Sequence, residues 1–245
     1  MTHVKICGIT NLDDALVAVE AGAGLLGFVF FPRSPRYIDP GRASEIVSAL
    51  KQRGNAPRFV GVFVDESLER VCAIAATAQL DMAQLHGNES PEMVRDLSAL
   101  GVETPSHKTV PDKSGSKAPF TGRSLVARRF IAVRALRPQN EAEAQAQVAE
   151  YRAAVNGNTP AFIVDAFDPQ RFGGTGARAD WGIAACIARE FPILLAGGLN
   201  ADNVAEAIRA VRPWGVDVSS GVERAPGLKD QDRVRQFVRK AKSVD

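Results

Sequence analysis

The stretch ILLAGGLNADNVAEAIRAVRPWGVDVSSG, residues 193–221, contains one complete unit of a β/α protein. A short apolar run at 193–196 is followed by two glycines and a helical segment, and a second apolar run follows at 215–219. The helical segment has apolar residues at the spacing of one helix face, namely Val204, Ala207, Ile208 and Val211. The stretch therefore predicts two parallel strands joined by a helix that covers the sheet.

The same alternation continues over the rest of the chain. Eight runs rich in β-branched and aromatic residues are each followed by a helical pattern, at 4–7, 25–30, 59–64, 82–86, 130–135, 161–165, 193–196 and 215–219. Four helix starts are predicted by capping residues: Asn11, Asp39 before Pro40, Ser90 before Pro91, and Asn200. Eight units favour a single (β/α)8 TIM barrel domain over residues 1–245, since open doubly wound sheets more often have five or six strands. No GxGxxG follows the first strand, as a dinucleotide fold would require.

One segment, 102–128, does not follow this pattern. It is rich in Pro, Ser, Gly and Lys and has no sustained period. We expect an irregular, flexible insertion before the fifth barrel strand, on the N-terminal face and therefore away from the face where barrel active sites form.

Composition excludes several classes of partner. The chain has 245 residues with 30 Lys and Arg against 28 Asp and Glu, a net charge of +2, which does not favour nucleic acid or an anionic membrane as the main partner. The N-terminus lacks an apolar signal segment, and the three cysteines have no CxxC spacing. We expect a cytoplasmic protein with reduced cysteines, either a monomer or a homodimer.

Polar and glycine-flanked residues stand at the predicted ends of most strands, where the reactive groups of such barrels lie. Gly197 and Gly198 follow the seventh strand, and Ser219, Ser220 and Gly221 follow the eighth. Glycine lets backbone N–H groups approach an anion, and this fold commonly binds phosphate in these two loops. Each loop alone is also compatible with an ordinary turn.

Strand alternation predicts which side chains face the barrel interior. If Cys7 lies at the mouth, then Lys5 lies one layer below it. By the same parity we expect the following residues to face inward: Gln84, His86, Arg134, Asp165, Asp217 and Ser219. Because a buried charge needs a close partner and the eighth strand closes beside the first, we expect Lys5 to pair with Asp217.

Two of these residues have the chemistry of an acid and a base. Cys7 precedes a glycine at a strand end, where a cationic neighbourhood would lower its pKa and make a thiolate base available. Asp165 is bracketed by apolar residues, and partial burial would favour the protonated acid. The structural alternatives are a small buried thiol for Cys7 and a cap or buried ion pair for Asp165.

Three further positions are candidates for substrate binding. Arg36, between Pro35 and Tyr37, could clamp a carboxylate or be a solvated loop cation. His86 could act as a base, although a lone histidine more often only makes hydrogen bonds, and no second histidine lies nearby to bind a metal. Gly174, in the GGTG segment beside Asp165, is expected to supply backbone donors or a gate.

The ordered motifs KICGIT, LGFVFFPRSPRYI, VGVFVD, QLHG, VDAFDPQRFGGTG, AGGLN and DVSSGVE resemble those of the phosphoribosylanthranilate isomerases of tryptophan biosynthesis, along nearly the whole chain. The resemblance implies an Amadori rearrangement of N-(5-phosphoribosyl)anthranilate to 1-(2-carboxyphenylamino)-1-deoxyribulose 5-phosphate. It implies Asp165 as general acid, Cys7 as general base, Arg36 on the anthranilate carboxylate and the two glycine loops on the phosphate. It implies neither metal nor cofactor.

Two other functions are compatible with such a barrel. A related phosphosugar isomerase would use two carboxylates, which the thiol at position 7 argues against. A non-catalytic barrel that binds a phosphorylated metabolite would have no need of both Cys7 and Asp165.

Overall fold

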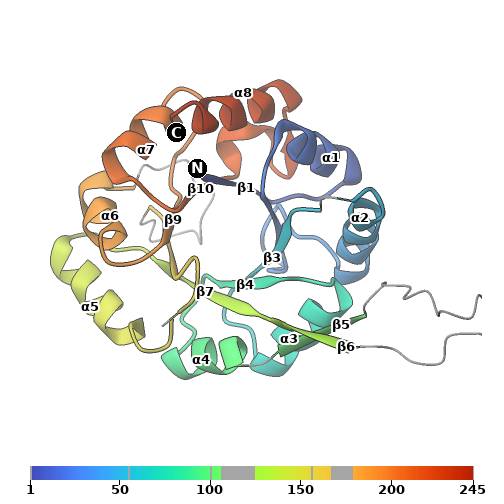
Figure 1. The fold of residues 1–245 in the computed structure, drawn as a ribbon, viewed down its shortest axis with the longest axis horizontal. Coiled ribbons are helices and arrows are strands. Elements are labelled where there is room, and N and C mark those ends of the chain that lie inside the picture. Colours follow the sequence, from blue (N-terminus) through green and yellow to red (C-terminus); the bar gives the residue numbers. More distant parts are fainter. Residues whose placement is uncertain are drawn as a thin grey trace, which may run out of the picture.

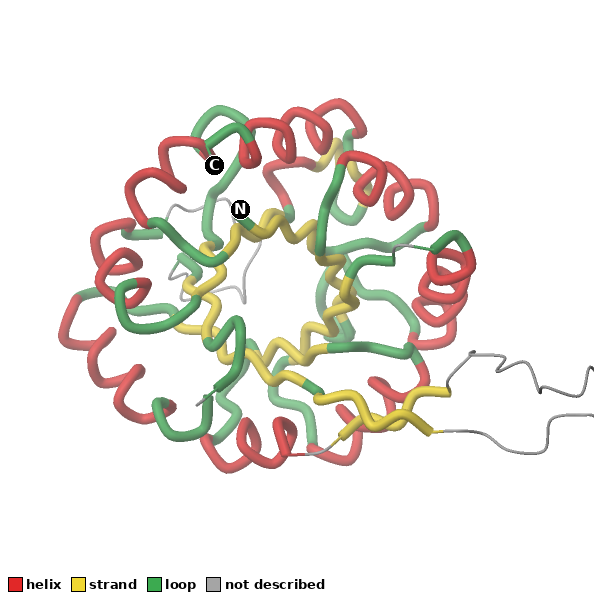
Figure 2. The backbone as a smooth tube through the Cα atoms, viewed as in Figure 1, coloured by secondary structure: helices red, strands yellow, loops and turns green. Residues whose placement is uncertain are grey.

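The computed structural model describes residues 2–54, 56–99, 101–105, 125–155, 157–166 and 179–244. Within them, parallel strands close into a barrel with helices around it (Figure 1), so that the strands form an inner ring and the helices an outer one (Figure 2). The barrel strands are β1 (His3–Cys7), β2 (Leu25–Val29), β3 (Arg58–Phe63), β4 (Met82–Leu85), β7 (Ile131–Leu136), β8 (Phe162–Val164), β9 (Ile193–Leu195) and β10 (Gly215–Val218). The predicted barrel is confirmed, with its order running β1-β10-β9-β8-β7-β4-β3-β2.

The helices lie where the periodic segments predict them. They are α1 (Leu12–Ala21), α2 (Pro40–Gln52), α3 (Leu68–Thr77), α4 (Pro91–Ala99), α5 (Glu141–Tyr151), α6 (Trp181–Ala188), α7 (Val204–Val211) and α8 (Gln231–Lys242). Asn11 and Asp39 cap α1 and α2, and the hydroxyl of Ser90 accepts from the N–H of Met93 in α4, as predicted. None of the described helices is long and apolar enough to cross a membrane.

The start of α7 follows the predicted cap at Asn200. The regular helix is Val204–Val211, and Asn200 caps the turn that leads into it, because its Oδ1 accepts from the N–H of Asp202 at 2.8 Å and from that of Asn203 at 3.2 Å. Asn203 in turn holds the loop after β9, since its side chain accepts from the N–H of Asn200 at 2.9 Å and donates to the carbonyl of Gly198 at 2.9 Å.

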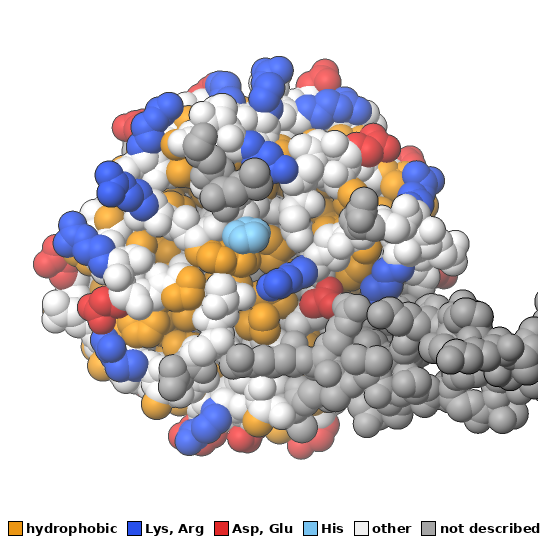
Figure 3. All heavy atoms as spheres, viewed as in Figure 1, with side chains coloured by type: hydrophobic (Ala, Val, Ile, Leu, Met, Phe, Trp, Pro, Cys, Tyr) orange, Lys and Arg blue, Asp and Glu red, His pale blue; other side chains and the backbone are white. Residues whose placement is uncertain are grey.

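The core has two layers. One cluster fills the barrel interior and consists of Leu25, Val60, Met82, Val133, Ala135, Ile163, Leu194 and Ala196. A larger cluster joins the outer face of the strands to the helices. On the outer surface, Figure 3 shows basic and acidic side chains around the edge of one face, with hydrophobic side chains gathered closer to its middle.

The segment 102–128, expected to be irregular, has regular structure at its two ends. The backbones of β5 (Gly101–Pro105) and β6 (Leu125–Arg129) form a two-stranded antiparallel sheet, with residue 102 opposite residue 128. Such pairing satisfies backbone N–H and carbonyl groups that a loop would leave to water. Residues 106–124 lie outside the described part of the chain.

Candidate active site

Lys5 is the centre of a buried polar network inside the barrel. Its side chain is fully buried, and its Nζ donates to Asp217 Oδ1 at 3.0 Å and to Gln84 Oε1 at 2.9 Å. The predicted pairing with Asp217 is confirmed, and the register explains it, because Lys5 and Asp217 are direct neighbours across β1 and β10. Burial by itself would lower the pKa of Lys5, but the Asp217 carboxylate outweighs it and the pKa is raised, so the ammonium stays charged.

The network continues to Asp165. Because Gln84 Oε1 accepts from Lys5, the Gln84 amide nitrogen faces His86 and donates to its Nδ1 at 3.0 Å. A neutral His86 then carries its hydrogen on Nε2, which lies 3.4 Å from Asp165 Oδ2. The other oxygen of Asp165 accepts from the N–H of Ala166 at 2.8 Å. The Ala166 N–H thus orients the carboxyl group at the end of β8, while His86 Nε2 lies close to the other oxygen without forming a hydrogen bond among the described residues.

Cys7 lies at the end of β1, packed against Val29 and Val62. A side chain at Gly27 would place its Cβ 2.8 Å from the Cys7 sulfur and 3.1 Å from Lys5 Cε, so only glycine leaves room for both groups at this point of β2. The sulfur therefore occupies a defined position above Lys5.

The electrostatics of Cys7 differ from the sequence prediction. Two cations, Lys5 and Lys229, are near and act to lower the pKa of the thiol. Burial is the larger effect, however: Cys7 is only 7% exposed, and its pKa is raised above the usual value. The prediction of a lowered pKa is wrong, because the tightness of the packing around the sulfur is not visible in the sequence.

Arg36 lies beside Cys7. A Cβ on Gly8, the residue after Cys7, would meet Arg36 Cδ at 2.7 Å, so the arginine stem packs directly on this glycine. The guanidinium is bound by Glu223, with Nε 2.9 Å from Oε1 and Nη2 2.7 Å from Oε2. Arg36 is therefore a largely buried cation that Glu223 holds in place, and not a solvated loop residue.

The two predicted phosphate loops come together. Gly197 and Gly198 both have positive φ, 84° and 64°, which glycine adopts without strain. Gly221 packs against the Leu199 carbonyl with no space for a Cβ, so the loop after β10 touches the loop after β9. Ser220 begins the short 3-10 helix η1 (Ser220–Val222). The Ser219 hydroxyl is buried and has no hydrogen-bond partner among the described residues.

Arg134 is the one predicted inward residue that the structure places on the opposite face. Its neighbours Val133 and Ala135 belong to the interior cluster, whereas Arg134 donates to Glu89 at 2.8 Å and lies 4.9 Å from the ring centroid of Tyr151 in α5. The prediction was wrong because the period-2 pattern of β7 was read one residue out of phase. The correct phase makes Arg137 the inward-facing arginine, and its charge interacts with that of Asp165.

Two other residues of the mouth were not singled out from the sequence, Glu223 and Lys229. They face each other across the hairpin of β11 (Glu223–Ala225) and β12 (Leu228–Lys229), which follows the eighth barrel strand. Glu223 is the last residue of the DVSSGVE motif but was given no role, and nothing in the local sequence marks Lys229, a charged residue near a turn. Gly174 lies in the segment 167–178, outside the described residues.

Comparisons with known proteins point to one family. The family model described as N-(5'-phosphoribosyl)anthranilate (PRA) isomerase matches residues 4–120 and 121–240. The N-(5'-phosphoribosyl)anthranilate isomerase of Geobacter sp. (strain M21) is 44% identical, with both chains covered in full. The crystal structure of phosphoribosyl anthranilate isomerase from Thermotoga maritima is similar with a TM-score of 0.78 and 36% identity, covering 99% of this chain and 100% of that one. A phosphoribosyl anthranilate isomerase in complex with reduced 1-(o-carboxyphenylamino)-1-deoxyribulose 5-phosphate gives a TM-score of 0.75 at 35% identity, with the same coverage.

Proposed function

The chain belongs to the phosphoribosylanthranilate isomerase family, and we propose that Asp165 is its general acid and Cys7 its general base. The protein is an isomerase of tryptophan biosynthesis that converts N-(5'-phosphoribosyl)anthranilate, an aminoaldose, to the aminoketose 1-(2-carboxyphenylamino)-1-deoxyribulose 5-phosphate. The observation that carries the assignment is the buried chain of contacts from Asp165 through His86 and Gln84 to Lys5, directly below Cys7.

The reaction needs one proton donor and one proton acceptor. The Asp165 carboxylic acid gives its proton to the furanose ring oxygen as the bond from C1 to that oxygen breaks, and the nitrogen lone pair forms the iminium. The C2 proton is then acidic, and the Cys7 thiolate removes it to form the enolamine, which tautomerises to the ketone. A thiol with a raised pKa is less often ionised near neutral pH, but its thiolate is the stronger base once formed.

Binding groups surround these two residues. The Arg36 guanidinium binds the anthranilate carboxylate, because an arginine fork matches a carboxylate in geometry and charge. The backbone N–H groups around Gly198 and Gly221 and the hydroxyl of Ser219 bind the phosphate. The partner is thus a small phosphorylated molecule. The unpaired cysteines Cys7, Cys72 and Cys186 suit the cytoplasm, where thiols stay reduced.

Steady-state kinetics with freshly prepared phosphoribosylanthranilate test the assignment through the loss of its fluorescence. Cys7→Ala and Asp165→Asn should each lower kcat by about 10²- to 10⁴-fold, the usual contribution of one acid or base. KM should change little, since both groups act in the transition state. Near-normal turnover of either variant would remove that residue from its proposed role, and the unaltered thermal unfolding of the variant is the control for folding.

A further inference from the structure

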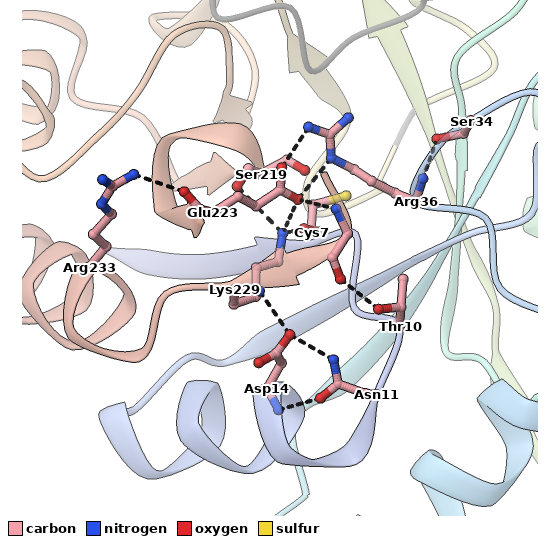
Figure 4. A network of polar contacts seen from close by, with 11 residues as sticks. Cys7, Thr10, Asn11, Asp14, Ser34, Arg36, Ser219, Glu223, Lys229 and Arg233 are labelled. Atoms are coloured by element: carbon pink, nitrogen blue, oxygen red, sulfur yellow. Dashed lines mark hydrogen bonds and ion pairs between the residues drawn. The ribbon is translucent and has the colours of Figure 1, made fainter. Parts of the chain in front are cut away.

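Buried charged side chains surround Glu223 in an arrangement that the acid and base chemistry does not explain. Figure 4 shows the Glu223 carboxylate between the Arg36 guanidinium and the Lys229 ammonium, with Cys7 beside them. The Glu223 side chain is 5% exposed and that of Lys229 is 1% exposed, so the charges are withdrawn from water. Burying ionic groups is costly unless they are paired, and pairing of this kind fixes geometry.

Glu223 occupies one edge of the guanidinium. It accepts from Nε and Nη2 of Arg36, the side-on pair of donors. Among the described residues the Arg36 side chain makes only these two hydrogen bonds, so the end-on pair formed by Nη1 and the second hydrogen of Nη2 is left for a ligand. A carboxylate can therefore bind Arg36 only from the end, in the direction that Glu223 sets.

Lys229 links this clamp to the base. Its Nζ donates to Glu223 Oε1 at 2.8 Å and to the backbone carbonyl of Cys7 at 2.5 Å. The lysine is itself fixed, because its backbone N–H donates to Asp14 Oδ2 at 2.8 Å. A single carboxylate thus holds both the arginine and, through one lysine, the strand end that carries the thiol.

The electrostatics favour an ionised Glu223 carboxylate. Burial would raise the pKa of its carboxyl, but the hydrogen bonds from Arg36 and the charge of Lys229 outweigh that effect, and the pKa is lowered. The backbone carbonyl of Glu223 also accepts from Arg233 at 2.8 Å, which fixes β11 from the outer side.

We propose that Glu223 is a positioning residue that presents the end of the Arg36 guanidinium to the substrate carboxylate. Through Lys229 it also holds Arg36 at a fixed position relative to Cys7. This rests on the proposed role of Arg36. An arginine free to sample its rotamers would bind the same carboxylate less tightly, because binding would then have to immobilise the side chain.

The test compares two ligands that differ only in the carboxylate. The first is the reduced product, 1-(2-carboxyphenylamino)-1-deoxyribitol 5-phosphate, and the second is the corresponding phenylamino compound. The Kd of the phenylamino compound divided by the Kd of the carboxyphenylamino compound is the ratio that measures how strongly the protein recognises the carboxylate. Glu223→Gln keeps the size of the side chain and removes its charge, and it should lower this ratio about tenfold. It should raise KM by a similar factor while kcat changes less than threefold.

The matched control is Glu89→Gln, which also breaks a buried pair, the one between Glu89 and Arg134 at 2.8 Å, on the helix side of the barrel. It should lower stability and leave the ligand ratio unchanged. If Glu223→Gln does not fold, Glu223→Asp keeps the charge but cannot reach both donors, and it should lower the ratio in the same direction.

The outcomes separate this inference from the function on which it rests. Arg36→Ala should abolish discrimination between the ligands, and adding Glu223→Gln to it should have no further effect on the ratio. If Arg36→Ala leaves the ratio intact, the role of Arg36 itself is wrong. If Arg36→Ala abolishes discrimination but Glu223→Gln leaves the ratio unchanged, or raises it because the carboxylate only offsets the arginine charge, the positioning role is overturned while that of Arg36 stands.

Discussion

The Lys5 network allows a quantitative prediction for the replacement Lys5→Met. Lys5 is fully buried and Asp217 is 8% exposed, so removing the ammonium leaves a carboxylate in the barrel without its partner at 3.0 Å. Removing one member of a buried ion pair typically costs about 3–5 kcal/mol. For a chain of this size each kcal/mol lowers Tm by about 2–4 °C. We therefore expect Tm to fall by roughly 6–20 °C.

The double replacement Lys5→Met with Asp217→Asn removes both charges. It should recover most of the lost free energy of unfolding, because a buried pair and its neutral substitute differ far less than a pair and a lone charge. Urea unfolding at pH 7, followed by far-ultraviolet circular dichroism, gives the free energies of unfolding of the wild type and the two variants. A loss below about 1 kcal/mol in Lys5→Met, or a double variant as unstable as the single one, would refute the reasoning.

The pH dependence provides a second check on the same pair. The pKa of Lys5 is raised in the folded protein, so its stabilisation is fully present below the ordinary lysine pKa of about 10.4 and is lost as the pH rises through the folded value. The difference in stability between the wild type and Lys5→Met should therefore be constant from neutral pH to about pH 9 and shrink above about pH 10.4. A difference that vanished near pH 7 would contradict this assignment.

Three further predictions concern the mouth and its support. Gly27→Ala should lower kcat and cost about 1–3 kcal/mol, because its Cβ would lie 2.8 Å from the Cys7 sulfur; a variant with unchanged kinetics would contradict the proposed position of the thiol. Because the proposed mechanism needs a proton on Asp165 and a thiolate at Cys7 at the same time, kcat/KM should fall once the pH passes the raised pKa of Cys7 and both groups have lost their protons, and a kcat/KM that kept increasing there would argue against this acid and base pair. Arg134→Met should cost about 3–5 kcal/mol by leaving Glu89 unpaired, yet leave KM unchanged, whereas a large increase in KM would return Arg134 to the substrate site.

Local periodicity was sufficient to predict the barrel. Apolar residues at helical spacing and eight β-rich runs identify the elements, since each pattern depends only on residues a few positions apart. The same alternation correctly predicted that Lys5 and Asp217 meet, because the closing of β1 against β10 follows from a complete barrel. It failed for Arg134, where an error of one residue in the phase of β7 moved the side chain to the other face.

The sequence by itself determined the fold, the family resemblance and the face of the barrel on which the polar groups gather. Only the tertiary structure decided the raised pKa of Cys7, because burial depends on packing by strands from distant parts of the chain. The same is true of the Arg36 and Glu223 pair, whose members lie 187 residues apart and meet only when the barrel closes. Periodicity is a local property of the chain, whereas burial, charge pairing and the direction of a guanidinium arise from contacts between segments that the sequence keeps far apart.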